Sequence, residues 1–172
     1  YLAEHDVVAE VAPTSRAAHF KFTFPEADSS YIMLDAFFKG SMVKILPKER
    51  KIIGYCRNNK GGVPENFHNY FIAEFDKNFE ITHTWKDNWE LQKNNLNSEG
   101  KHVGAIIGFK TKKGEVVHVK VASSFISLEQ ALINLDREIG NDTFEDTKQK
   151  AKNAWEEELG RIKIEDDSID NI

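Results

Sequence analysis

The stretch VVHVKVASSFISLEQALINLDREI, residues 116–139, contains the change from one kind of secondary structure to another. Val117, Val119 and Val121 alternate with polar residues, which is the period of a strand with one buried face. After residue 125 the apolar side chains recur at steps of three and four, so they share one face of a helix. These apolar residues are Leu128, Leu132, Leu135 and Ile139. The pattern predicts β-strands before this stretch and helices for nearly all of the chain after it.

Polar residues mark the ends of two helices in the last third of the chain. Ser127 and Gln130 have the spacing of a capping box, and Gly140 is a typical residue just after a helix end. Thr143 and Asp146 predict the start of a second helix, which ends near Gly160. The apolar stripe of this second helix is expected to be buried and consists of Phe144, Thr147, Ala151, Ala154, Trp155 and Leu159.

The part of the chain before the helices predicts a series of short strands. Residues 19–24 alternate clearly, with three phenylalanines on one side. Residues 31–38 are apolar on both faces, which predicts a central strand, whereas residues 26–30 and 86–101 are polar and predict loops. Further strands are expected at residues 7–12, 42–46, 51–55, 67–75, 79–85, 102–109 and 115–121. Short strands joined by turns, without alternating helices, predict an antiparallel β-sandwich.

The composition excludes several classes of protein. The net charge of the 172 residues is −5, which disfavours a nucleic-acid-binding protein because such proteins need clustered Lys and Arg. No apolar run approaches the length of a membrane span. Cys56 is the only cysteine, so no disulfide can form within the chain, and its apolar strand predicts a buried structural thiol. Tyr1 and Leu2 have the character of a strand end, so a fragment of a longer protein is expected.

The titratable residues point to no obvious catalytic constellation. None of the six histidines has a metal-ligand spacing, which favours ordinary surface or half-buried histidines. No pair of carboxylates stands out for glycoside chemistry. Asp35 lies in an apolar strand, where a carboxylate needs a partner, and we interpret it as a strand-end residue bonded to backbone or to an Arg. The six histidines are His5, His19, His68, His83, His102 and His118.

The segment WKDNW, residues 85–89, is the best candidate for a ligand surface. Trp85 and Trp89 offer flat aromatic faces beside Asp87, and this combination suits the CH-rich face and the hydroxyl groups of a sugar. The alternative is that the two Trp side chains cap the core at a strand end. We therefore predict Trp85, Asp87 and Trp89 as carbohydrate-contact residues, with the core-capping interpretation left open.

Three segments, in the same order, resemble glycoside hydrolase family 92, the α-mannosidase family. VKVASSFISLEQALINLDREI at residues 119–139 is similar to a family signature, and AKNAWEEELGRIKI at residues 151–164 has the family's A…W…LGRI pattern. VAEVAPTSRAAHFKFTFP at residues 8–25 resembles the family's first strand pair. Gly54 also matches a family strand. The resemblance covers nearly the whole chain.

The resemblance implies a domain layout and an activity for the parent protein. Residues 1–125 are expected to be part of an N-terminal β-sandwich of the supersandwich, galactose-mutarotase-like kind. Residues 126–172 are expected to be linker helices and a short strand at residues 161–165, leading to an (α/α) barrel. Family members are calcium-dependent, inverting exo-α-mannosidases, typically exported by bacteria to the periplasm or cell surface. Their catalytic carboxylates and calcium ligands belong to the barrel, so no catalytic or metal residue is carried over to this chain.

The function expected for this chain is therefore non-catalytic. It would pack against the catalytic barrel of the same parent chain, which acts on a mannose-containing glycan, and it would be inactive alone. Two alternatives stay open. One is a stand-alone carbohydrate-binding module that uses Trp85 and Trp89. The other is a structural interaction domain that docks through Phe144, Trp155 and Leu159 of the second predicted helix.

Overall fold

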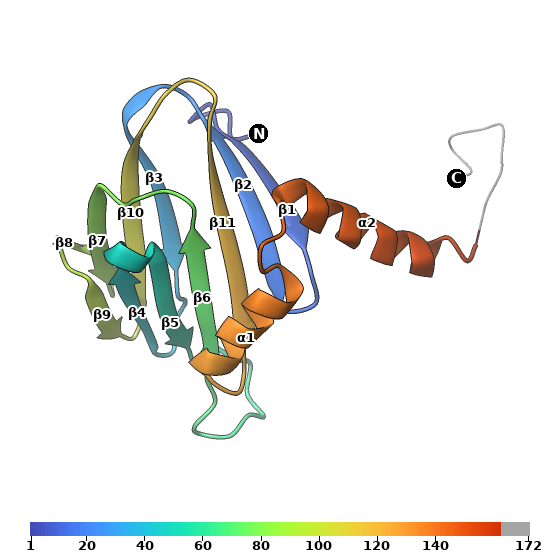
Figure 1. The fold of residues 1–172 in the computed structure, drawn as a ribbon. Coiled ribbons are helices and arrows are strands. Elements are labelled where there is room, and N and C mark those ends of the chain that lie inside the picture. Colours follow the sequence, from blue (N-terminus) through green and yellow to red (C-terminus); the bar gives the residue numbers. More distant parts are fainter. Residues whose placement is uncertain (163–172) are drawn as a thin grey trace.

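The computed structural model describes residues 1–162, which form two antiparallel β-sheets followed by two helices (Figure 1). The larger sheet has the strand order β1-β2-β11-β6-β5-β4-β9, and the smaller sheet has the order β3-β10-β7-β8. The strands are β1 (Val8–Pro13), β2 (Ala17–Phe24), β3 (Ala27–Asp35), β4 (Ser41–Leu46), β5 (Lys51–Cys56), β6 (Asn69–Phe75), β7 (Ile81–Lys86), β8 (Glu90–Lys93), β9 (Asn97–Gly100), β10 (Val103–Thr111) and β11 (Glu115–Ser124). The helices are α1 (Leu128–Glu138) and α2 (Phe144–Leu159), and a short 3-10 turn spans Pro47–Glu49. This architecture confirms the predicted fold class.

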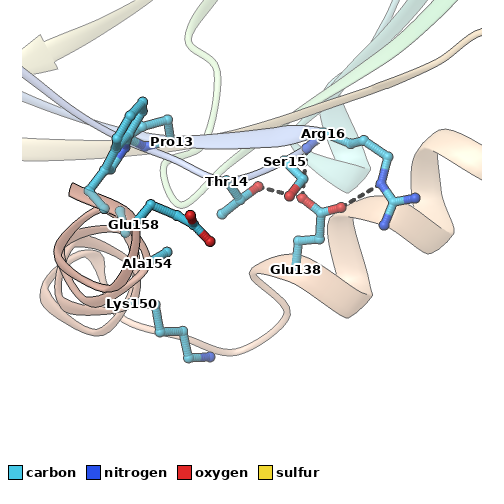
Figure 2. Close-up of a pocket in the computed structure, with 10 residues that line it drawn as sticks. Pro13, Thr14, Ser15, Arg16, Glu138, Lys150, Ala154 and Glu158 are labelled. Atoms are coloured by element: carbon cyan, nitrogen blue, oxygen red, sulfur yellow. Dashed lines mark hydrogen bonds and ion pairs between the residues drawn. The ribbon is translucent and has the colours of Figure 1, made fainter. Parts of the chain in front are cut away.

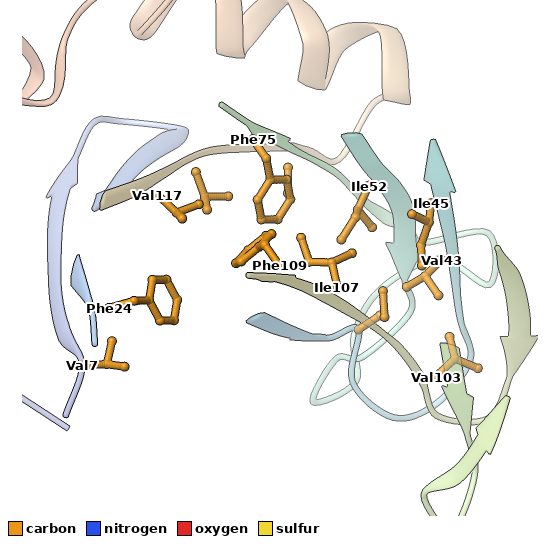
Figure 3. Packing of buried hydrophobic residues seen from close by; sticks show 14 residues of the cluster. Val7, Phe24, Val43, Ile45, Ile52, Phe75, Val103, Ile107, Phe109 and Val117 are labelled. Atoms are coloured by element: carbon orange, nitrogen blue, oxygen red, sulfur yellow. The ribbon is translucent and has the colours of Figure 1, made fainter. Parts of the chain in front are cut away.

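The main hydrophobic core lies between the two sheets (Figure 3). The larger sheet contributes Ile52 and Phe75, and β10 of the smaller sheet contributes Ile107 and Phe109. These side chains point inward because they occupy alternate positions of strands whose other face is turned away from the core. Cys56 at the end of β5 is buried as a free thiol, as predicted.

Two glycines of β10 let aromatic rings lie flat on the outer face of the smaller sheet. A Cβ on Gly104 would come within 2.4 Å of both the Leu34 carbonyl oxygen and the Trp85 ring. A Cβ on Gly108 would come within 2.8 Å of the Tyr31 ring. Glycine at these two positions therefore leaves the room that the Trp85 and Tyr31 rings occupy on the outer face of the smaller sheet.

The prediction of a central strand at residues 31–38 is wrong. β3 is an edge strand that pairs only with β10, and it starts at Ala27, within the predicted loop at residues 26–30. Tyr31 and Met33 are 51% and 55% exposed. An apolar run indicates that both faces of a strand are apolar, but it does not indicate whether a second layer covers each face.

The prediction of a loop at residues 86–101 is also wrong. This segment contains β8, which pairs with β7, and β9, which pairs with β4. Both are four-residue strands at sheet edges. Edge strands are commonly short and polar because one side of their backbone faces solvent, and a polar sequence of this kind resembles a loop.

Helix α1 covers the outer face of the larger sheet, against β11 and β6 (Figure 1). The Ser127 side chain accepts a hydrogen bond of 3.1 Å from the Gln130 backbone N–H, which confirms the predicted helix start. Leu135 and Ile139 are buried as predicted, but Leu132 is exposed. Ala131 is buried instead, in a cluster with Ile72 and Ala122 of the larger sheet.

Helix α2 begins as predicted but is not buried along its length. Thr143 and Asp146 form a complete capping box, and Gly160 follows the last turn. Phe144 and Thr147 are buried, whereas the predicted stripe continues into solvent, and Ala154, Trp155 and Leu159 are exposed. The helix extends away from the sheets after its first turns (Figure 1), so an apolar face has no covering layer in residues 1–162. The predicted strand at residues 161–165 lies, from residue 163 on, outside the described residues.

Candidate functional site

The three predicted carbohydrate-contact residues lie together where β7 turns into β8, but they differ in exposure. Trp85, the penultimate residue of β7, is only 1% exposed. Trp89 covers it by stacking on its ring, with the two ring centroids 4.3 Å apart. Trp89 is 58% exposed, and Asp87 is exposed beside it. Asp87 and Trp89 can therefore reach a ligand in solution, while Trp85 supports Trp89 from below. Sugar contact at this turn stays a prediction.

His102 connects this turn to the loop between β3 and β4. Its Nε2 lies 2.7 Å from Oδ1 of Asp35, and its ring centroid is 3.9 Å from that of Phe38. The same His102 ring lies edge-on to Trp85, at 4.7 Å, and at 5.8 Å from Trp89. We call His102, Asp35, Phe38, Trp85 and Trp89 the His102 cluster. Sequence spacing offered no signal for it, since Asp35 and His102 are 67 residues apart.

Asp35 is the last residue of β3, as predicted. Its Oδ1 accepts a 2.7 Å hydrogen bond from the Phe37 backbone N–H as well as contacting His102. The partner is thus backbone and a histidine, and not an Arg. The carboxylate side chain is 38% exposed, so it is not the buried acid that an apolar strand suggested.

A second histidine cluster holds the first turn of α2 on β2. His19 is buried, and its ring lies 5.2 Å from that of His118 and 5.5 Å from that of Phe144. Burial first, and then the charges of Lys120 and His118, lower the pKa of His19 to about 4. A neutral His19 accounts for this packing, since a charged imidazole would be poorly solvated there.

An open groove of about 610 Å³ lies between α2, the end of α1 and the turn that joins β1 to β2 (Figure 2). On one side Glu138 accepts hydrogen bonds from the Thr14 hydroxyl, at 2.5 Å, and from Arg16 Nε, at 2.6 Å. Burial alone would raise the pKa of Glu138, but these hydrogen bonds together outweigh it and place the pKa below its ordinary value. The apolar side of the groove is formed by Pro13, Ala151, Ala154 and Trp155.

Within residues 1–162, no group of three or more His, Cys, Asp or Glu side chains is arranged to hold a metal ion. No helix in this part of the chain is long and apolar enough to cross a membrane. Calcium dependence of the parent protein therefore stays a prediction, with no ligand assigned among the described residues.

Comparison with family models covers nearly the whole chain. Residues 1–124 match the glycosyl hydrolase family 92 N-terminal domain, and residues 130–172 match the glycosyl hydrolase family 92 catalytic domain. The chain belongs to glycosyl hydrolase family 92. The second match starts within α1, so α2 and most of α1 lie in the part that matches the family 92 catalytic domain. The predicted family is confirmed.

Solved family 92 structures share this fold. A family 92 inverting mannosidase from Bacteroides thetaiotaomicron is 35% identical, with a TM-score of 0.88, over 92% of this chain and 21% of its own. A family 92 α-mannosidase from the same species is 32% identical, with a TM-score of 0.81, over 96% of this chain and 24% of its own. The latter enzyme was also solved in complex with mannoimidazole. The chain thus spans less than a quarter of the length of these two relatives. A comparison with curated proteins gave no match.

Proposed function

We propose that this chain is the non-catalytic N-terminal portion of a calcium-dependent, inverting exo-α-mannosidase, and that it packs against the catalytic domain. The observation that carries the proposal is the succession of the two family 92 matches along one chain, N-terminal domain first and catalytic domain second. The names of the relatives, an inverting mannosidase and an α-mannosidase, support the substrate class. By the same family argument the parent protein is exported by a bacterium and acts on a mannose-containing glycan.

The exposed face of α2 supports packing against a further domain. Trp155 and Leu159 are 61% and 67% exposed, and Ala151 and Ala154 continue their stripe into the groove of Figure 2. A Trp and a Leu on one solvent-facing stripe are typical of a surface that another layer covers. Because the catalytic-domain match runs through α2 to residue 172, the proposed layer is the rest of the catalytic domain.

Inverting chemistry bears on which part of the parent protein carries the catalytic residues. An inverting glycosidase needs an acid and a base on opposite sides of the scissile bond, far enough apart for a water molecule. The family resemblance gives both carboxylates to the catalytic domain, and Glu138 of this chain is held by the Thr14 hydroxyl and by Arg16. We therefore assign the acid, the base and the calcium ligands to the catalytic domain, with this chain as its structural support.

Release of mannose from an aryl α-mannoside tests this proposal. The chain alone is expected to release none above the buffer rate, while a polypeptide that continues into a complete catalytic domain is expected to be active in the presence of calcium. Mannose release by the chain alone at enzyme-like rates would overturn the non-catalytic assignment.

Substitution on α2 tests the packing. Trp155→Ala is expected to leave the melting temperature of this chain unchanged and to lower that of the complete protein, because Trp155 is covered only there. Met33→Ala, which also removes an exposed apolar side chain, is the matched control. Equal effects of Trp155→Ala on both proteins would contradict the docking role. Self-association of the isolated chain that Trp155→Ala abolishes would favour the alternative, a structural interaction module.

A further inference from the structure

We propose that the His102 cluster, together with the neighbouring Asp87, is a saccharide contact site of this chain, in which Trp89 and Phe38 are the aromatic surfaces and Asp35 and Asp87 accept hydrogen bonds from sugar hydroxyls. The ligand class is a mannose-containing oligosaccharide, and this choice of sugar rests on the proposed function. The site differs from the pattern read in the sequence, because Trp85 becomes a support and Phe38, Asp35 and His102 are added.

The aromatic rings of the cluster are exposed yet firmly supported. Trp89 and Phe38 are 58% and 59% exposed. Each is backed by a buried ring, since Trp89 stacks on Trp85 at 4.3 Å and Phe38 lies over His102 at 3.9 Å. A ring that is supported on one face and open on the other offers a rigid platform to the CH-rich face of a sugar, with little side-chain entropy to lose on binding.

The backbone that carries these rings is held in an unfavourable conformation. Trp89 and Asp87 have φ angles of 64° and 48°, and Phe37, next to Phe38, has a φ angle of 61°. Non-glycine residues rarely adopt such angles, and bulky aromatic residues least of all. Such strain persists where surrounding contacts impose it, and it gathers at binding and catalytic sites. At the β7–β8 turn the Asp87 N–H donates a 2.6 Å hydrogen bond to the His102 carbonyl oxygen, which ties the turn to the His102 cluster.

Polar groups lie beside the two platforms. Oδ1 of Asp35 is occupied by His102 and by the Phe37 N–H, which orients the carboxylate and leaves Oδ2 without a partner in residues 1–162. The Asp87 carboxylate is exposed at the turn. The buried indole N–H of Trp85 also has no acceptor among the described residues, and an orphan donor of this kind is rare in a native protein. Aromatic platforms beside carboxylate acceptors match the mixed apolar and hydroxyl surface of a hexose.

Titration of the chain with mannobiose tests the site. The protein has three tryptophans, so Trp155→Phe leaves Trp85 and Trp89 as the only tryptophan emitters. Saturable change of their emission is expected with mannobiose. Isothermal titration calorimetry then compares variants, because Trp89→Ala removes a reporter. Trp89→Ala is expected to weaken binding at least about tenfold, and Trp155→Ala, which removes an equally exposed Trp outside the cluster, is expected to leave it unchanged.

Two further variants keep the test decisive if Trp89→Ala is poorly folded. Trp89→Phe retains an aromatic face and is expected to bind more tightly than Trp89→Ala. Asp35→Asn retains the size of the side chain and is expected to weaken binding through loss of the carboxylate. Absence of mannobiose binding by the wild-type chain would overturn the site, and so would equal affinities for wild type and Trp89→Ala. Neither result would overturn the mannosidase proposal, because the hydrolysis assay tests that proposal separately. Equal affinity for maltose would overturn the choice of mannose.

Discussion

At the scale of single residues, His19 links the packing of α2 to pH. Its pKa is lowered to about 4 in the folded chain, against the ordinary value of 6.5. Between these values the unfolded chain binds a proton that the folded chain does not, so the free energy of unfolding falls as the pH drops from 6.5 towards 4. We expect His19 to account for a loss of up to about 3 kcal/mol over this window, measured by urea unfolding at several pH values.

A comparison of variants isolates the contribution of His19. Glu138 and other carboxylates with a lowered pKa also lower the free energy of unfolding as the pH falls. The measured quantity is therefore the difference in free energy of unfolding between wild type and His19→Gln at each pH. The free energy of unfolding of His19→Gln is expected to fall less than that of the wild type as the pH drops from 6.5 towards 4. His5→Gln, at an exposed position, is the control and should follow the wild type. Parallel curves for wild type and His19→Gln would refute this role.

Gly104 is a second residue whose effect can be predicted. A Cβ at this position would meet the Leu34 carbonyl oxygen and the Trp85 ring at 2.4 Å, and backbone cannot move aside easily. Gly104→Ala is therefore expected to destabilise the chain by about 1–3 kcal/mol, seen as a lower urea midpoint. Gly100→Ala, whose nearest neighbour is at 3.3 Å, should cost less. The opposite order would show that the sheet accommodates the methyl group at Gly104.

At the scale of elements, the two helix caps are expected to differ in their effect on the whole chain. α1 is packed on the larger sheet through Ala131, Leu135 and Ile139, whereas α2 is buried only at its first turn. Ser127→Ala should lower the free energy of unfolding by about 1 kcal/mol, the usual cost of a lost N-cap. Thr143→Ala should mainly reduce the helical circular dichroism signal, with a smaller shift of the urea midpoint. A larger midpoint shift for Thr143→Ala would indicate that α2 is integral to the core.

At the scale of the whole molecule, one core joins both sheets. Ile52 of the larger sheet and Ile107 of the smaller sheet belong to the same cluster, and both are fully buried. Replacing either by Ala is expected to cost about 2–5 kcal/mol and to shift a single transition. Urea unfolding followed by circular dichroism and by tryptophan emission should coincide, with Leu132→Ala on the exposed side of α1 as the control. Separate transitions would mean that the sheets unfold independently.

The order of elements follows from local patterns in the sequence. Alternation placed most of the strands, and Ser127 and Thr143 placed the two helix starts, because these signals depend on neighbours within one turn or one strand. The family resemblance also lay in contiguous segments. Trp85 and Trp89 belong to one five-residue segment, and the turn between β7 and β8 stacks their rings.

Tertiary structure decided what each pattern became. Sheet order made β3 an edge strand, and it brought Asp35 and Phe38 to His102 across more than sixty residues of chain. The Trp85 ring packs against Gly104, which has no side chain, and is buried, whereas Trp89 remains exposed. The stripe on α2 is apolar in sequence yet uncovered in residues 1–162. A residue's own neighbours along the chain set its local conformation, but burial and long-range contacts depend on which surfaces meet after the sheets assemble.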